Sequence, residues 1–231
     1  MDLKMEEVAR LLNVTPEAIE QWVEEGALPA YEIGGKHRFS RSEIEAWMMN
    51  RHSAEGFLSG PMEERSIDTS RLAGIHQFNL YRAIFRGGVY CHVPGDTKEE
   101  VIRRTMAQVA RRFSLDADVL TDLLLDRERM MPTALGRGIG VPHTRDFLLN
   151  THFDLITVVF PQTPLSYGAL DGKPVHTLFF LFACEDTRHL KLLSKIAYLS
   201  SDDRALELLR QQPDKNTLLH FVKEWEGSLG G

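Results

Sequence analysis

Two uninterrupted apolar runs constrain the fold more than any other feature of the sequence. They cover residues 155–160, Leu-Ile-Thr-Val-Val-Phe, and residues 177–183, Thr-Leu-Phe-Phe-Leu-Phe-Ala. Runs of this length predict strands that are buried on both faces. Apolar residues at helical spacing lie before and after the two runs, so helices are available to cover both faces. We therefore expect an α/β domain in which a mixed β-sheet is flanked by helices.

The rest of this domain follows from capping and periodicity. A strand is predicted over 88–93, and Thr97 with Glu100 predicts a capping box that opens a helix. Further helices are predicted over about 116–127, 187–200, 202–211 and 215–226. Together these elements make a domain of about 145 residues, which is large enough to bury its own core.

Residues 53–70 divide the chain. This stretch, SAEGFLSGPMEERSIDTS, mixes Gly, Ser, Pro and acidic residues without a helical or alternating pattern, which predicts a linker. A helix is predicted after it, ending at Gly87-Gly88. The expected organisation is a small module over 1–52, a linker and bridging helix over 53–87, and the α/β domain over 88–231.

The net charge of −6 is unevenly distributed. Residues 1–52 hold 6 basic and 10 acidic side chains, and residues 53–70 hold 1 and 4. The remaining residues therefore carry a small positive excess. An acidic total argues against a general nucleic-acid coat, and here that argument applies to the first 70 residues alone.

Cysteine content and hydropathy indicate a cytoplasmic protein with no membrane insertion. Cys91 and Cys184 cannot form a disulfide framework, and both fall in or beside predicted strands as expected buried apolar residues. No apolar run approaches the roughly 18 residues that a membrane span needs. The first residues, MDLKMEEVARLL, do not have the pattern of a signal peptide.

The N-terminal module has the plan of a winged helix-turn-helix. One helix is predicted over 4–12, and Thr15 with Pro16 opens a second that ends at Gly26. A hairpin around Gly34-Gly35 forms the wing, and Ser40 with Glu43 predicts a capping box for a third helix. We expect the tryptophans of the helices to lie in the module's core.

The segment EEVARLLNVTPEAIEQWVEEGALPAYEIGGKHRFSRSEIEAW resembles the excisionase/MerR-like DNA-binding domains. The resemblance implies that the second helix faces DNA, but its outward positions are acidic or neutral. Carboxylates there oppose binding to phosphates. The basic candidates for DNA contact lie around the wing: Lys36, His37, Arg38 and Arg41. DNA binding through the wing and a protein-contact role for the module both remain open.

The segment most suited to chemistry is GRGIGVPHTR, residues 136–145. Its glycines do not follow the dinucleotide fingerprint, and no apolar strand is predicted to lead into it. Pro142 favours an extended approach to His143, and arginines on both sides favour an anion. Neutral imidazole is abundant at neutral pH and is a good nucleophile toward phosphorus.

Five segments resemble the type-2 (fructose, mannitol and nitrogen-regulatory) enzyme IIA domains of the bacterial phosphotransferase system. They span roughly residues 88–226 and read GDTKEEVIRRTMAQVA, LLLDRERM, GRGIGVPHTR, LDGKPVHTLFFLFAC and HLKLLSKIAYLSSDDRALELL. The resemblance implies that His143 accepts a phosphoryl group from phosphohistidine on the carrier HPr or its nitrogen-branch relative. It implies that His189, at a helix N-terminus, lies beside the site, and that Arg127 neutralises charge on the phosphoryl oxygens.

Each of these residues also has a structural interpretation. His143 and His189 could be core histidines, His189 could be a helix cap, and Arg127 could be an exposed arginine at a helix end. Two histidines could begin a zinc site, but no third ligand lies at metal-like spacing. We therefore expect no metal and no cofactor.

The leading hypothesis is a regulator in which a phosphoryl acceptor is fused to a winged helix-turn-helix, with DNA or regulatory proteins as partners. In this case phosphohistidine forms as a transferase-type intermediate. One alternative is a sugar-transport enzyme IIA that passes phosphoryl to an enzyme IIB. The other is a DNA-binding regulator whose IIA fold is an unphosphorylated scaffold.

Overall fold

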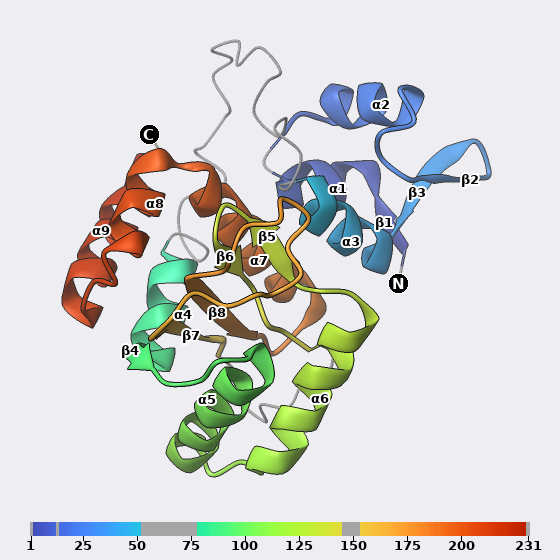
Figure 1. Cartoon of the computed structure of the whole chain (residues 1–231). Coiled ribbons are helices and arrows are strands. Elements are labelled where there is room, and N and C mark those ends of the chain that lie inside the picture. Colours follow the sequence, from blue (N-terminus) through green and yellow to red (C-terminus); the bar gives the residue numbers. More distant parts are fainter. Residues whose placement is uncertain (1, 13, 52–77, 145–152, 230–231) are drawn as a thin grey trace.

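The computed structural model describes residues 2–12, 14–51, 78–144 and 153–229 (Figure 1). The predicted linker, the start of the predicted bridging helix and Arg145 lie outside these residues. Two bodies lie side by side in Figure 1: a small module with α1, α2, α3 and the wing, and a larger layered domain.

The module confirms the winged plan and adds a strand. Its helices are α1 (Met5–Leu12), α2 (Pro16–Glu24) and α3 (Arg41–Arg51), and its hairpin is β2 (Tyr31–Ile33) with β3 (Lys36–Ser40). The hydroxyl of Thr15 caps α2 by accepting from the amide of Ala18 at 3.3 Å, as predicted. An additional strand, β1 (Asp2–Lys4), pairs antiparallel with β3.

The predicted capping box at α3 was wrong. The Glu43 carboxylate accepts a hydrogen bond from the Tyr31 hydroxyl, and the Ser40 hydroxyl contacts that of Ser42. The wing turn brings Tyr31 over the start of α3, so Glu43 ties the wing to the helix instead of capping it.

The larger domain is a mixed sheet between two helical layers. Its elements are α4 (Asn79–Gly87), β4 (Val89–Val93), α5 (Lys98–Phe113), α6 (Ala117–Met130), β5 (Ala134–Gly136), β6 (Ile139–Gly140), β7 (Leu155–Pro161), β8 (Thr177–Phe182), α7 (Asp186–Ser201), α8 (Asp203–Arg210) and α9 (Lys215–Ser228). The strand order is β4-β7-β8-β6-β5, with β4–β7 and β6–β8 parallel and the other pairs antiparallel. The predicted fold class is confirmed.

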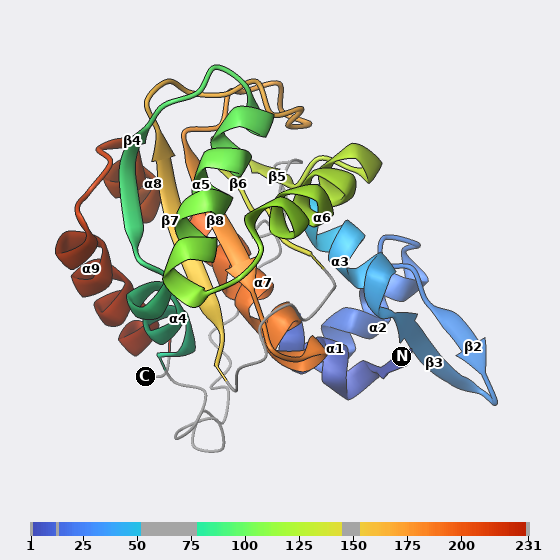
Figure 2. The ribbon, with the colours of Figure 1, turned by 90° about the horizontal axis from the view of Figure 1, so that it is seen from below.

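Alternation along the two apolar strands separates the two layers. Leu155 and Val159 of β7 pack with α5 and α6, whereas Ile156 and Val158 pack with α4, α7, α8 and α9. Figure 2 shows these helices on opposite sides of the sheet. Burial on both faces explains why the two runs contain no charged residue.

The core of the module is continuous with one of these layers. Ile44, Met48 and Met49 of α3 belong to the same buried apolar cluster as Leu135 of β5 and Leu192 of α7. α1 and α3 both pack against α7, and α3 also contacts β5. The module is therefore docked on the domain, while the wing projects away from it (Figure 2).

The glycine-rich segment differs from the prediction because short strands flank it. β5 and β6 form an antiparallel pair, and β6 adds to β8. Gly138 lies between them with a φ of +87°, and a Cβ there would come within 2.4 Å of the His176 ring. This tight turn needs glycine for both its backbone conformation and its close approach to His176.

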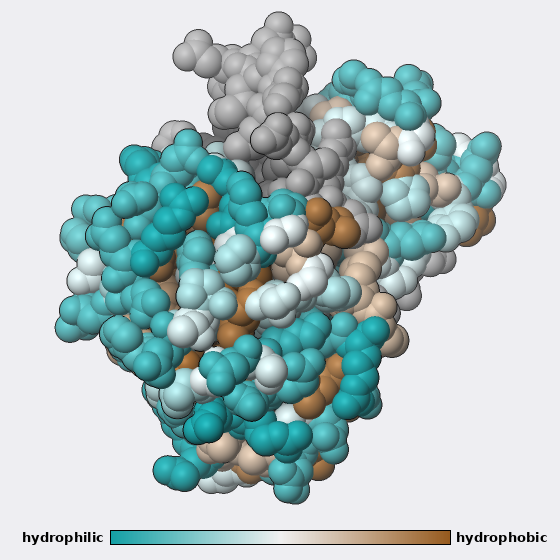
Figure 3. All heavy atoms as spheres, viewed as in Figure 1, coloured by the Kyte–Doolittle hydropathy of each residue, from teal (hydrophilic) through white to brown (hydrophobic). Residues whose placement is uncertain are grey.

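Two predictions about cysteine were wrong. Cys91 is exposed on β4, the edge strand of the sheet, where the pairing with β7 is irregular between Tyr90 and Val93. Cys184 follows β8 and is half-buried. The face in Figure 3 is mostly hydrophilic with small hydrophobic patches. In the described part of the chain, no helix combines the length and hydropathy that crossing a membrane requires.

Candidate functional site

His143 lies three residues after β6, where it forms an isolated parallel bridge with Leu181 of β8. The amide of Leu181 donates to the carbonyl of Pro142 at 3.0 Å, and the amide of Val141 donates to the carbonyl of Thr133 at 2.8 Å. Backbone contacts on both sides thus fix the Val141-Pro142-His143 step. The side chain of His143 is fully buried, at 0% exposure.

The ring of His143 is oriented by a backbone carbonyl. Its Nδ1 lies 2.7 Å from the carbonyl oxygen of Val141, which is an acceptor, so Nδ1 carries the proton. In the neutral ring the lone pair is therefore on Nε2. A nucleophilic imidazole needs such a defined tautomer.

His189 lies in the first turn of α7 and faces His143. The two ring centroids are 5.2 Å apart and the ring planes meet at 63°. Burial lowers the pKa of His189, and the charge of His143 acts in the same direction, although contact with Glu45 opposes both. Its amide donates to the carbonyl of Glu185 at 2.9 Å, so the first turn of the helix holds this residue in place beside His143.

Glu45 of α3 completes the cluster, and sequence reasoning missed it. One carboxylate oxygen, Oε1, lies 3.0 Å from Nε2 of His143 and 3.0 Å from Nε2 of His189. The contact with His189 has the geometry of a hydrogen bond. The contact with His143 is close enough for an ion pair, but its angles do not meet hydrogen-bond geometry. A residue of the N-terminal module thus lies between the two histidines of the α/β domain.

The protonation state of Glu45 is set by the two histidines. Burial alone raises the pKa of the Glu45 carboxyl. Hydrogen bonds with His143 and His189, and the charges of these two rings, lower the pKa by more than burial raises it, so the net pKa is well below its usual range. Glu45 is therefore an anion in the pocket at neutral pH. Its exposure is 0%.

One signal in the sequence could have identified Glu45. On α3 it shares a helical face with Met48 and Met49, which are buried, and it directly follows the buried Ile44. A carboxylate on the apolar face of an amphipathic helix needs a polar partner. Its partner here is 98 residues away in sequence, so no local pattern could name it.

A second contact joins the same two helices. Arg41, one turn before Glu45 on α3, forms an ion pair with Asp186, three residues before His189 on α7. The two contacts therefore form a matched pair along the helix interface. Arg41 is one of the four basic candidates for DNA contact, and in this structure its side chain binds the α/β domain.

Arg127 and Arg137 each donate a hydrogen bond to a backbone carbonyl. Arg127 is buried at the end of α6 and donates to the carbonyl of Met131 at 3.1 Å, so it is not the exposed helix-end residue of the alternative interpretation. Arg137 was expected to flank an anion beside His143. It instead donates to the carbonyl of Ser201 and forms an ion pair with Asp203.

The three buried side chains also meet the first requirement of a metal site. Within the described residues, Glu45, His143 and His189 form a set of donor atoms that lie within 4.8 Å of one another. Two histidines and a carboxylate are a donor set that zinc uses. Glu45 is thus a third donor beside the two histidines, which spacing in the sequence did not indicate.

The wing keeps its basic residues at the surface, and α2 keeps its acidic ones. Lys36 is exposed, and His37 and Arg38 are half-buried. The outward side chains of α2 are all exposed: Glu17, Glu20, Gln21, Glu24 and Glu25. The helix that would face DNA in this plan therefore presents carboxylates.

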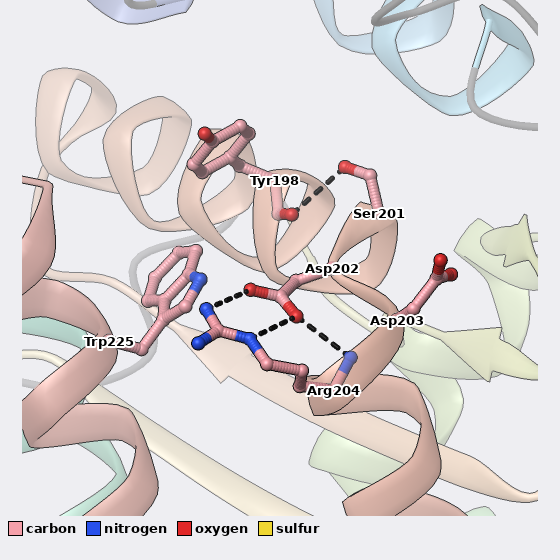
Figure 4. A pocket seen from close by; sticks show the side chains of 6 residues that line it. All are labelled: Tyr198, Ser201, Asp202, Asp203, Arg204 and Trp225. Atoms are coloured by element: carbon pink, nitrogen blue, oxygen red, sulfur yellow. Dashed lines mark hydrogen bonds and ion pairs between the residues drawn. The ribbon is translucent and has the colours of Figure 1, made fainter.

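An open pocket lies at the other end of α7 (Figure 4). Ser201 lies 12 residues after His189, which corresponds to about 18 Å along the helix axis. The main polar contact in this pocket joins Arg204 to Asp202 at 3.0 Å, and Asp202 also caps α8 through the amides of Arg204 and Ala205. We assign this arrangement to capping of α8.

The fold and the site define a class: a mixed-sheet α/β domain with two facing buried imidazoles, joined to a small winged helix-turn-helix. The family described as the phosphoenolpyruvate-dependent sugar phosphotransferase system, EIIA 2, matches residues 87–225, and the chain belongs to this family. A helix-turn-helix domain matches residues 3–52. Both resemblances in the sequence are confirmed.

Several relatives of this chain are named nitrogen regulatory proteins, and others include a multiphosphoryl transfer protein and a fructose-specific EIIABC component. A nitrogen regulatory protein from Pseudomonas aeruginosa is 33% identical over 146 residues, which cover 62% of this chain and 94% of the relative. One from Escherichia coli K12 is 29% identical over 153 residues, covering 64% and 90%. The structure of nitrogen regulatory protein IIA-Ntr from Neisseria meningitidis shares the fold, with a TM-score of 0.54, 23% identity and coverage of 59% and 93%.

Proposed function

We propose that the protein is a regulatory phosphoryl acceptor of the phosphotransferase system, and that Nε2 of His143 is the accepting atom. The observation that carries this proposal is the 2.7 Å contact between Nδ1 and the carbonyl of Val141. Because this contact places the proton on Nδ1, the lone pair of Nε2 faces the pocket beside His189. The proposed donor is phosphohistidine on HPr or on its nitrogen-branch relative.

The transfer balances without a cofactor. The lone pair of Nε2 forms a bond to phosphorus as the nitrogen–phosphorus bond of the donor breaks, and the donor imidazole leaves with the electron pair. Throughout the transfer, the Nδ1–H of His143 continues to donate its hydrogen bond to the carbonyl of Val141. His189, with its imidazole edge in the pocket, would donate a hydrogen bond to a phosphoryl oxygen.

Two features favour regulation over sugar transport. Several of the relatives reported above are named nitrogen regulatory proteins, and this chain joins the domain to a helix-turn-helix module. In a transport role the phosphoryl group would pass to an enzyme IIB. The two unpaired cysteines fit the reducing cytoplasm in which we propose that the protein acts.

Phosphorylation can be tested directly. The protein is incubated with phosphoenolpyruvate, enzyme I and HPr or its nitrogen-branch relative until labelling reaches its end point. We expect an acid-labile, alkali-stable phosphate that is absent from His143→Ala and retained in His220→Ala, a variant at an exposed histidine on α9. Label that persists in His143→Ala would assign the acceptor to another residue.

DNA binding through the wing is a second candidate function, favoured by the basic residues Lys36, His37 and Arg38 on β3. If these side chains contact phosphates, affinity should fall with rising salt, with a negative slope on logarithmic axes. Replacing Lys36 and Arg38 by Gln should reduce that slope by about 2, because each phosphate contact contributes about 1. No binding at about 50 mM salt would leave protein contact as the function of the module.

A further inference from the structure

We propose that Glu45 is an internal ligand of the phosphoryl pocket, so that docking of the module through α3 and phosphorylation of His143 are mutually exclusive. This inference rests on the proposed function and adds its regulation. The carboxylate is placed where an anionic group attached to His143 would project. The N-terminal module would then close the site at His143 in addition to any binding of partners.

Glu45 blocks access to His143 sterically. Oε1 of Glu45 lies 3.0 Å from Nε2 of His143, which leaves no room for phosphorus and its three oxygens to be inserted between them. His143 is 0% exposed, so the imidazole of a donor protein cannot come into line with it while α3 is docked. Attack by His143 therefore requires that α3 leave the pocket.

The charge of Glu45 also opposes phosphorylation of His143. The Glu45 carboxylate lies 3.0 Å from Nε2 of His143, the atom on which the phosphoryl group would form. After transfer, the phosphoryl group carries about two negative charges, which would repel the buried Glu45 anion.

Arg41 and Asp186 form a second contact between the same two helices. The Arg41–Asp186 ion pair orients α3 on α7, and it must break when Glu45 leaves. Undocking therefore also releases Arg41, which lies directly after the basic strand of the wing. By thermodynamic linkage, an anionic partner that binds the released Arg41 would shift the equilibrium toward phosphorylated His143. Phosphorylation of His143 would raise the affinity for that partner by the same factor.

The test compares initial phosphorylation rates at a fixed concentration of phosphorylated donor. If only the undocked fraction reacts, Glu45→Ala should accelerate phosphorylation about tenfold or more. Asp186→Asn, which alters a half-exposed residue and leaves the histidines intact, should accelerate it about two- to fivefold. Glu43→Ala, on the same helix but bonded to Tyr31, should leave the rate within about twofold.

The outcomes separate this inference from the proposed function. Equal rates in wild type, Glu45→Ala and Asp186→Asn, with His143-dependent labelling in each, would overturn the inference and leave the proposed function standing. Failure of labelling in all variants, Glu45→Ala included, would overturn both. Because the same three side chains can supply metal ligands, each rate is measured with and without EDTA. Acceleration that disappears with EDTA would assign closure to a bound ion instead of the carboxylate.

A second measurement does not depend on variants. Amide hydrogen exchange in α3 and in the first turn of α7 should be faster in the phosphorylated wild-type protein than in the unphosphorylated one. The amides of α5 serve as the internal control, since this helix lies on the opposite face of the sheet. Unchanged protection of α3 in fully phosphorylated protein would overturn the inference.

Discussion

At the scale of single residues, buried carboxylates join elements that are distant in sequence. Glu45 joins α3 to the two histidines, and Glu226 of α9 holds the start of α4. The carboxylate of Glu226 accepts from the amides of Leu80 and Tyr81 at 3.1 and 2.8 Å and pairs with Lys195. Helix α4 has no side-chain cap of its own, so Glu226 satisfies amides that the helix leaves open.

Glu226→Ala should lower the free energy of unfolding by about 2–3 kcal/mol, because it leaves two helix amides and a partly buried lysine without their acceptor. Urea denaturation followed by circular dichroism measures this loss. Glu224→Ala, at an exposed position on the same helix, should change stability by less than about 0.5 kcal/mol. Similar losses in the two variants would contradict the capping role of Glu226.

At the scale of elements, the sequence predicted what periodicity can encode. The helices from α5 to α9 and the strands β4, β7 and β8 follow from apolar spacing and capping residues such as Thr97, whose hydroxyl accepts from the amide of Glu100. Strands β1, β5 and β6 have two or three residues, which is too short for a period to appear. Their positions depend on the partner strand.

The candidate site shows the same limit. His143 and His189 were found because a short motif surrounds each of them, and the structure brings their rings together. Glu45 was not found, because its burial results from docking between two separately patterned parts of the chain. Cys91 was misassigned because an apolar strand does not reveal from its sequence that it lies at the edge of a sheet.

The turn at Gly138 allows a test of backbone geometry. Gly138→Ala should cost about 2 kcal/mol or more, from the positive φ and from a clash with His176. Gly172→Ala has a similar φ, +66°, but open space around it, and should cost only about 1 kcal/mol. Adding His176→Ala to Gly138→Ala should recover part of the loss in urea denaturation; no recovery would show that His176 does not cause it.

At the scale of the whole molecule, the two matched domains share one buried apolar cluster. Trp22 and Trp47 of the module pack together with ring centroids 5.4 Å apart, and Trp225 lies in the larger domain. Since α3 is held on α7 by both apolar and charged contacts, we expect the module and the domain to unfold together.

Trp225→Phe leaves both remaining tryptophans in the module as reporters. In this background, the fluorescence transition in urea should coincide with the circular dichroism transition of the whole protein. Adding Glu45→Ala should move the fluorescence transition to lower urea, because docking no longer supports the module. Separate transitions in the protein that retains Glu45 would show that the two parts are not coupled.

The order of the chain gives the Glu45 contact a consequence for biosynthesis. Glu45 precedes His143 by 98 residues, so the helix that covers the pocket leaves the ribosome well before the pocket itself. Domains generally fold in order from the N-terminus during synthesis. We therefore expect α3 to be available while the α/β domain is still being synthesised. Each new molecule would then fold with Glu45 already docked against His143, and His143 could be phosphorylated only after the module separates from the domain.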